Sequence, residues 1–304
     1  MVREPVRASV EHEGWGATLL ACQDEDGQWA GGAFVPAGFT AKLWEAEGQP
    51  WTATAFTFDL LRDLGLPPGC AAARRTVAAV GANARWDHAG EPFWDGEVEE
   101  CINGRLVTTG SYFGVDMDGV IDRLLDQQMS DGGWNCEREN GSVRGSFHTT
   151  INGLEGLLAA QTAHGGVQDI TAARHAGEEF LLERRLFRRQ TTGEPADPDF
   201  LPIGSSPRWE YDVLRGLDYC RAAALHDGVG PTREQRKHWT TSSPAGSMTA
   251  VGAPTGGPAV GSGCTQTSPA SPRLGSPSRH CGYWPGQTST DRHHASMSRT
   301  QSLN

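Results

Sequence analysis

One short pattern occurs twice in the sequence and restricts what the chain can fold into. The segments 23–29 and 128–134 both read Gln-x-x-x-Gly-x-Trp, and each follows an apolar stretch, ATLLAC or VIDRLLDQ. A glycine after a helix tolerates the positive φ that a tight turn requires. An indole can pack beneath such a turn, and a glutamine side chain can bond to its open backbone groups. The pattern therefore predicts helices joined by similar turns.

A second repeat is helical. The segments PWTATAFTFDLL, SFHTTINGLEGL and RWEYDVLRGLDYC align with apolar residues about three positions apart, a spacing that marks one buried helix face. The aligned positions hold Thr52, His148 and Tyr211; Ala55, Ile151 and Leu214; Phe58, Leu154 and Leu217; and Asp59, Glu155 and Asp218. The copies are unequally spaced, so a strict solenoid period is excluded. We expect an insertion of irregular structure over 83–112 to account for part of the gap.

Few segments alternate with a period of two, so the sequence predicts an almost entirely α-helical body. The expected helices are 16–22, 52–65, 71–82, 117–128, 148–163, 171–187 and 210–224. The body is assigned to a repeat domain over 10–230. A turn pattern between helices of this kind predicts helical hairpins.

The last 74 residues, 231–304, have a different composition. Gly, Pro, Ser and Thr supply 39 of them, whereas Leu, Val, Ile and Phe together supply four. Such a segment cannot bury enough apolar surface to offset its chain entropy, so we predict a disordered, low-complexity tail. The tail carries 7 Lys/Arg and 2 Asp/Glu, against 19 and 35 in the rest of the chain.

A shifted reading frame offers a sharper interpretation of this tail. If the third base of each codon is read with the first two of the next, Met248–Thr249 forces an aspartate. The following codons, through Gly252, then permit Asp-Gly-Arg-Trp, which would be a further Gly-x-Trp turn. The codons of 275–286 permit an apolar helical pattern that the written sequence lacks. We therefore predict a frame break between about Gly230 and Arg236, with 231–304 translated out of frame.

Charge and apolar content exclude several classes of protein. The formal net charge of −11 argues against a nucleic-acid partner. No run of about 18 apolar residues exists, so no transmembrane segment is expected. The N-terminal residues MVREPVRASV have no apolar run typical of a secretory signal, and the seven cysteines form no CxxC pair. These features favour a cytoplasmic protein with reduced thiols.

The repeats resemble a known superfamily. Gln-x-x-x-Gly-x-Trp turns between paired helices, with the stretches QDEDGQWAGGAF, WDGEVEECINGR and QQMSDGGWNCERENGSVRGSFHTTINGLEGL, are similar to terpenoid cyclases and protein prenyltransferases, and in particular to bacterial prenyltransferase or squalene-cyclase-like repeat proteins. The resemblance covers about residues 10–228. It implies an α/α toroid, here incomplete, in which inner helices surround a central hydrophobic cavity. It also implies an isoprenoid as the hydrophobic small-molecule partner.

The resemblance to prenyltransferases implies zinc as a cofactor. Those enzymes hold zinc with Asp-x-Cys and a distant histidine, and the metal activates a thiolate. Glu99 and Cys101, followed by His148, give a related pattern in which glutamate replaces aspartate. Cys136 is a further candidate ligand. The alternative is a hydrogen-bonded structural loop.

The resemblance to squalene-type cyclases implies a catalytic acid. Their Asp-x-Asp-Asp motif protonates an alkene in a dry aromatic cavity. This chain has Asp116 and Asp118 followed by Gly119, so the last aspartate of the motif is absent. The alternative is that one of the two aspartates caps the following helix. His148 is the third candidate catalytic residue.

Aromatic residues are the candidates for binding an isoprenoid. Trp51, Trp94 and Trp209, with Trp15, are the candidate cavity residues, because an indole face stabilises a carbocation by cation–π attraction. Core packing is the alternative for each. The basic segment 178–190 could meet a diphosphate, or be a solvated helix face.

Three functions remain open from the sequence. The first is an isoprenoid-related transferase or cyclase. The second is a non-catalytic helical repeat protein that binds a hydrophobic ligand or a protein partner. The third is an inactive product of a damaged gene.

Overall fold

The computed structural model describes residues 4–40, 51–165, 168–202 and 209–229. Within these ranges the chain is helical and has no β-strand, which confirms the all-α prediction. The α-helices are α1 (Glu4–Ser9), α2 (Gly14–Ala21), α3 (Thr54–Asp63), α4 (Ala71–Asn83), α5 (Glu100–Phe113), α6 (Asp118–Asp126), α7 (Phe147–His164), α8 (Gln168–Glu183) and α9 (Val213–His226). Two short 3₁₀ turns, η2 (Phe93–Asp95) and η3 (Pro198–Phe200), lie in the connections.

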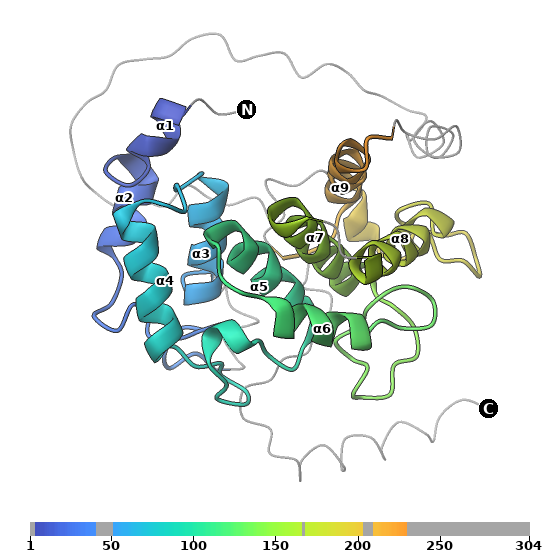
Figure 1. Ribbon diagram of the computed structural model, residues 1–304. Coiled ribbons are helices and arrows are strands. Elements are labelled where there is room, and N and C mark those ends of the chain that lie inside the picture. Colours follow the sequence, from blue (N-terminus) through green and yellow to red (C-terminus); the bar gives the residue numbers. More distant parts are fainter. Residues whose placement is uncertain (1–3, 41–50, 166–167, 203–208, 230–304) are drawn as a thin grey trace, which may run out of the picture.

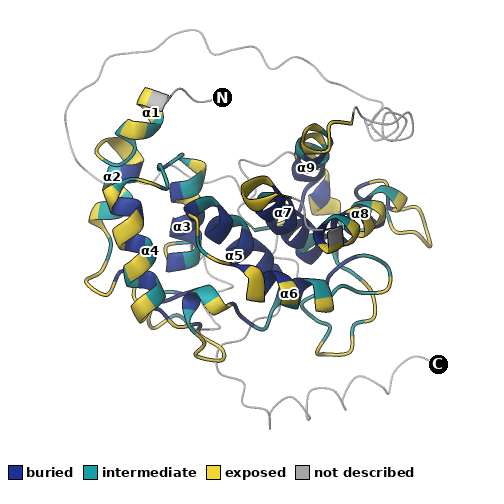
Figure 2. Ribbon diagram, viewed as in Figure 1, coloured by how far each residue is buried: buried dark blue, intermediate teal, exposed yellow. Residues whose placement is uncertain are grey.

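Helices α3, α5, α7 and α9 form a central row in the structure. Helix α3 contacts α5, α5 contacts α7, and α7 contacts α9. Helices α2, α4, α6 and α8 lie around this row, so the chain passes alternately through the surrounding layer and the central row (Figure 1). The central helices α5 and α7 are mostly buried, whereas α4 and α8 have exposed faces (Figure 2).

The two tryptophans of the repeated pattern have equivalent environments. Trp29 Nε1 donates to the carbonyl of Leu19 at 2.7 Å, and Trp134 Nε1 donates to the carbonyl of Leu124 at 2.8 Å. In both copies the acceptor lies ten residues earlier, in the preceding helix. Both indoles are buried and form part of the core. Each indole therefore links the end of a surrounding helix, α2 or α6, to the turn that follows it.

The two glutamines also make the same bond. Gln23 Nε2 donates to the carbonyl of Gly27 at 2.7 Å, and Gln128 Nε2 donates to that of Gly132 at 2.8 Å. Gly27 and Gly132 have positive φ values, 91° and 82°. The side chain thus satisfies a carbonyl group of a turn that only a glycine enters without strain.

The turn in each copy is hydrogen-bonded to the first turn of the next central helix. The backbone N–H of Trp29 donates to Thr54 Oγ1 at 3.1 Å, and that of Trp134 to Thr150 Oγ1 at 3.0 Å. Thr54 and Thr150 are fully buried in the first turn of α3 or α7. A hydroxyl at this position therefore links the turn to the helix that follows.

The expectation of irregular structure over 83–112 holds for 84–99, which contains only the short turn η2, but it is wrong for 100–112, because α5 occupies Glu100–Phe113. Twelve of its residues are buried, among them Asn103, Arg105 and Thr109. Polar groups buried inside the structure remove the alternation of apolar and polar faces by which a surface helix is found in a sequence. The central position of helix α5 therefore follows from its contacts with neighbouring helices, and its sequence shows no clear apolar stripe.

Two glycines allow α5 and α7 to pack closely. A Cβ atom at Gly104 would lie 2.4 Å from the carbonyl carbon and oxygen of Asn152, and one at Gly156 would lie 2.5 Å from the carbonyl oxygen of Gly104. No side chain fits between backbones at these separations. Gly104 of α5 and Gly156 of α7 thus permit the close approach of the two central helices.

The alignment of the three helical segments predicts the buried face of α3 and α7 better than that of α9. Ile151, Leu154 and Phe58 are buried, but Leu214 is 47% exposed. Helix α9 instead buries Arg215, Gly216, Tyr219 and Ala223. The ion pair that Arg215 makes with α7 turns this face inward, and so Leu214 points outward.

The predicted tail, 231–304, lies outside the described residues. Among the residues that are described, none of the helices combines the length and apolar character needed to cross a bilayer.

Candidate functional site

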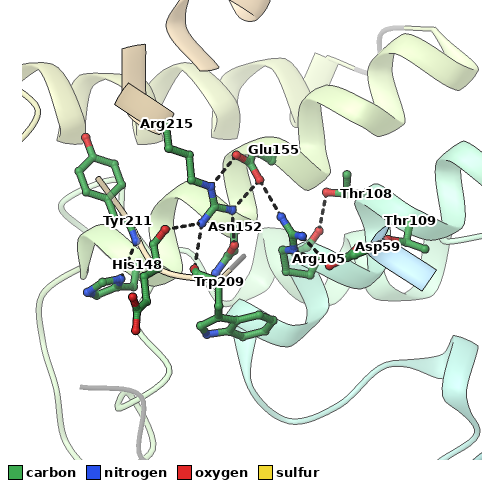
Figure 3. A network of polar contacts seen from close by, with 12 residues as sticks. Asp59, Arg105, Thr108, Thr109, His148, Asn152, Glu155, Trp209, Tyr211 and Arg215 are labelled. Carbon is green, nitrogen blue, oxygen red and sulfur yellow. Dashed lines mark hydrogen bonds and ion pairs between the residues drawn. The ribbon is translucent and has the colours of Figure 1, made fainter. Parts of the chain in front are cut away.

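A chain of alternating charges connects the four central helices. Asp59 lies on α3, Arg105 on α5, Glu155 on α7 and Arg215 on α9 (Figure 3). Arg105 Nε donates to Asp59 Oδ2 at 2.8 Å, and Arg105 Nη1 donates to Glu155 Oε2 at 3.3 Å. Arg215 Nε and Nη2 donate to the two oxygens of Glu155 at 2.8 and 2.6 Å. Each helix of the row contributes one charged side chain.

The balance of these charges determines the pKa of Glu155. Burial alone would raise it, but Arg215 and then Arg105 outweigh this effect and lower the pKa to about 2. The reverse balance holds the pKa of Arg105 above its ordinary value, since Asp59 and Glu155 together exceed the cost of burial. Glu155 and Arg105 are therefore charged at neutral pH, and each depends on its neighbours for compensation.

A small pocket lies against this chain of charges. Its polar side is formed by Asp59, Arg105 and Thr109, and the Thr109 hydroxyl donates to the Asp59 carboxylate. The rest of the lining is apolar and largely aromatic, comprising Phe34, Ala55, Phe58, Trp86, Phe93, Ile102, Leu106 and Trp209. The free space is about that of one water molecule in this conformation. The pocket thus presents aromatic walls above a charged, hydrogen-bonded base.

Trp209 closes the pocket and joins distant parts of the chain. Its ring lies 5.2 Å from the ring of Phe34 and 5.8 Å from that of Phe56, both in or near the first central helix. Its carbonyl accepts a hydrogen bond from Arg215 Nη1 at 2.9 Å. The segment that precedes α9 therefore meets the segment around α3, so the row of central helices curves.

The three predicted aromatic residues have different positions. Trp209 lines the pocket, and Trp51 packs against Phe56 at 4.7 Å beside it. Trp94 is not part of the pocket lining. Its Nε1 donates to the carbonyl of Val77 at 3.2 Å, which makes it a packing residue between α4 and the core. Trp15, the fourth aromatic candidate, is 75% exposed.

Three of the predicted metal ligands come together. Single ligand atoms of Glu99, Cys101 and Cys136 all lie within 4.8 Å of one another. Glu99 and Cys101 lie at the start of α5, whereas Cys136 belongs to the connection between α6 and α7. Cys101 Sγ donates to Glu99 Oε2 at 3.5 Å, and the Thr149 hydroxyl donates to Cys136 Sγ at 3.6 Å. We refer to Glu99, Cys101 and Cys136 as the thiol–carboxyl cluster.

Burial dominates the electrostatics of the thiol–carboxyl cluster. Desolvation, followed by the negative charges of Cys136 and Glu97, raises the pKa of Glu99 to about 9. The pKa of Glu97 is also raised by burial, and its Oε1 is buried with no hydrogen-bond partner among the described residues. Several acidic groups are therefore held close together with little positive charge to compensate them. A bound cation would lower this cost.

His148 does not share the thiol–carboxyl cluster, as far as the described residues go. Its Nδ1 accepts a hydrogen bond from the backbone N–H of Tyr211 at 2.8 Å, and its ring lies 5.3 Å from that of Phe200. The structure thus places His148 where it links α7 to the segment before α9.

The two candidate acids, Asp116 and Asp118, are exposed. Asp116 Oδ1 accepts the backbone N–H of Asp118 at 3.0 Å, which stabilises the turn between α5 and α6. This turn follows the C-terminal end of α5, about 20 Å from the thiol–carboxyl cluster by helix length. Neither aspartate lines the pocket.

A second group of potential ligands is His175, Glu178 and Asp227. Arg174, which is fully buried, makes ion pairs with both Glu178 and Asp227. The carboxylates are therefore already neutralised, and this group connects α8 to the end of α9 as a structural clamp.

Sequence reasoning missed Arg105 and Arg215 as site residues. The alignment did place Asp59 and Glu155 at one common position, which was the available signal. An acidic residue repeated on the buried side of a helix requires a compensating cation, which Arg105 and Arg215 of neighbouring helices supply, with Arg62 of α3 also paired to Asp59 at 3.2 Å.

Comparisons with known proteins found no match. No family model fits the chain, and no curated protein or solved structure is detectably similar to it.

Proposed function

We propose that the chain is an isoprenoid-related transferase or cyclase-like protein built as an α/α toroid. Support comes from the alternation of central and surrounding helices, and from the two Gln-x-x-x-Gly-x-Trp turns with equivalent hydrogen bonds. In this proposal α3, α5, α7 and α9 are the inner helices of a ring that is incomplete. The aromatic pocket lies on the inner side of that ring.

The thiol–carboxyl cluster is the proposed zinc site. Two thiols and a carboxyl group are a donor set that suits Zn²⁺ better than Mg²⁺ or Ca²⁺. Three protein ligands leave a fourth position open, which is typical of catalytic rather than structural zinc. The orphaned Oε1 of Glu97 and the raised pKa of Glu99 are features that a cation would relieve. When bound, zinc would supply Lewis acidity at that open position.

The pocket is the proposed site for a hydrophobic group. Its aromatic walls favour an apolar chain or a developing carbocation, while Asp59, Arg105 and Thr109 offer polar contacts at one end. A prenyl chain is much larger than the present free space. Entry of a prenyl chain therefore requires the half-buried side chain of Trp209 to move away from Phe34. Helix α5 connects the two sites, because Cys101 belongs to the thiol–carboxyl cluster and Ile102 to the pocket.

The observation that carries the proposal is the convergence of Glu99, Cys101 and Cys136 within 4.8 Å. The test is the metal content of the full-length chain, purified without added metal and measured by inductively coupled plasma mass spectrometry. We expect about one zinc per chain, lost in Cys101→Ser and in Cys136→Ser. Cys220→Ser is the matched control, since Cys220 is a half-buried cysteine on α9 and should keep its zinc.

A second candidate function is supported by the pocket alone. A non-catalytic repeat protein that binds a hydrophobic ligand would need the aromatic lining but not the thiol–carboxyl cluster. Metal-free wild-type protein that copurifies with a lipid, and that loses the lipid in Trp209→Ala, would favour this function over the first. Metal-free protein with no bound lipid would leave neither function supported.

A further inference from the structure

The two cysteines of the thiol–carboxyl cluster approach each other from different parts of the chain. Their Sγ atoms lie within 4.8 Å, although 34 residues separate Cys101 from Cys136 in the sequence. A disulfide needs an Sγ–Sγ distance of about 2.05 Å. Rotation of one cysteine about its Cα–Cβ bond, between staggered rotamers, moves a sulfur atom enough to close a gap of this size. The pair is therefore placed for a bond that the sequence spacing alone would not suggest.

We propose that Cys101 and Cys136 form a reversible disulfide, and so a redox modification site. The bond would join the N-terminal end of α5 to the connection between α6 and α7. These two segments are already in contact through Arg138, which pairs with Glu100 at 2.9 Å. Because the segments are held together by this ion pair and by the α5–α7 contact, the disulfide would form without a large backbone movement.

The two cysteines differ in access to solvent, which sets the order of events. Cys136 is half-buried, whereas Cys101 is fully buried. A low-molecular-weight disulfide therefore reaches Cys136 first. The Cys136 sulfur attacks one sulfur of that disulfide, forms a mixed disulfide and expels one small thiol. The Cys101 sulfur then attacks the Cys136 sulfur and expels the second small thiol.

Electrons and protons balance in this sequence. The two cysteines lose two electrons and two protons, and the small disulfide gains both to become two thiols. A dithiol reductant reverses the reaction by the same two exchanges. Because the small disulfide reaches only Cys136, the first exchange occurs at that residue. The second exchange is intramolecular, because Cys101 lies beside it in the fold.

Oxidation would change the thiol–carboxyl cluster directly. Both sulfur ligands would be consumed, and only the Glu99 carboxyl would remain. If the proposed function holds, the disulfide would therefore displace the metal, and bound zinc would slow oxidation. This consequence rests on the proposed zinc site, but disulfide formation itself does not.

The experiment uses the full-length chain, first freed of metal with EDTA and reduced, then exposed to oxidised glutathione. Remaining thiols are alkylated, the protein is digested, and peptides are identified by mass spectrometry. We expect a peptide pair joined through Cys101 and Cys136 as the main cross-link, abolished by dithiothreitol. Cys101→Ser should trap glutathione on Cys136, and the control Cys220→Ser should leave the cross-link unchanged. Circular dichroism confirms that each variant keeps its helices.

Two results would overturn the proposal. One is wild-type protein in which Cys136 retains glutathione and Cys101 remains alkylatable. The other is a cross-link mainly to a different cysteine. A parallel reaction with added Zn²⁺ separates this inference from the proposed function. Equal oxidation rates with and without zinc would be consistent with the proposed disulfide but would contradict zinc binding by these thiols.

Discussion

Glu155 of α7 and Arg215 of α9 are joined by two hydrogen bonds, from Nε at 2.8 Å and from Nη2 at 2.6 Å. The planar guanidinium meets both carboxylate oxygens, a geometry that lysine cannot reproduce. Glu155 also accepts Arg105 Nη1, so one carboxylate serves two helices. The position of α9 against α7 depends on this pair, because Leu214 on the other face of α9 has no buried role.

Glu155→Gln should destabilise the fold by about 3 kcal/mol, since it leaves Arg105 and Arg215 buried with less compensation. Urea unfolding followed by circular dichroism measures the change. Asp218→Asn is the matched control, because Asp218 aligns with Glu155 in the sequence but its side chain is 67% exposed. We expect a change below about 0.5 kcal/mol there. A similar loss in both variants would contradict a special role for Glu155.

Gly104→Ala should destabilise the protein by about 3 kcal/mol. The added Cβ would lie 2.4 Å from backbone atoms of Asn152, and backbone cannot move aside as a side chain can. Gly119→Ala is the control, because a Cβ at Gly119 in α6 meets nothing within 4 Å. That variant should gain up to about 1 kcal/mol from helix propensity. Thermal unfolding of both variants distinguishes helix contact from propensity.

The elements that the sequence predicts best are those whose apolar residues recur at helical spacing. The expected helices 52–65 and 148–163 match α3 (Thr54–Asp63) and α7 (Phe147–His164) closely. In the repeated turns, glycine adopts a positive φ, glutamine bonds to the backbone and tryptophan packs beneath the turn, as the sequence pattern predicts. In these segments local propensity, periodicity and turn chemistry agree, so the sequence pattern was sufficient.

Helix α5 could not be predicted in the same way. Its two faces both meet protein, so Arg105 and Asn103 occupy buried positions where the pattern expects leucine. Their identity depends on partners elsewhere in the chain, namely Asp59 for Arg105 and Glu97 for Asn103. The thiol–carboxyl cluster could be predicted only in part. Its cysteines and glutamate are recognisable as ligands in the sequence, but their proximity depends on helix α5, which the sequence pattern does not predict.

The stability of the metal-free protein should fall as pH rises from about 5 to 9, because of Glu99. Its pKa is about 9 in the folded state and near 4.5 when unfolded, so only the folded state holds the proton in this range. Unfolding then releases a proton, and stability decreases with pH by up to about 1.4 kcal/mol per unit from this group. Glu99→Gln should flatten the profile. Urea unfolding in EDTA at several pH values measures it, and an unchanged slope would show that Glu99 is ionised.

The tryptophan of the repeated turn should matter for its N–H group as well as for its size. Trp134→Phe keeps most of the buried ring but removes the bond to the carbonyl of Leu124. We expect a loss of about 2 kcal/mol, since that carbonyl would remain without its partner inside the core. Trp29→Phe should give a similar loss, because Trp29 makes the equivalent bond to Leu19. Trp15→Phe, at an exposed position, should leave urea unfolding unchanged. Unequal losses at Trp29 and Trp134 would mean that the two turns, despite their matching hydrogen bonds, do not stabilise the fold in the same way.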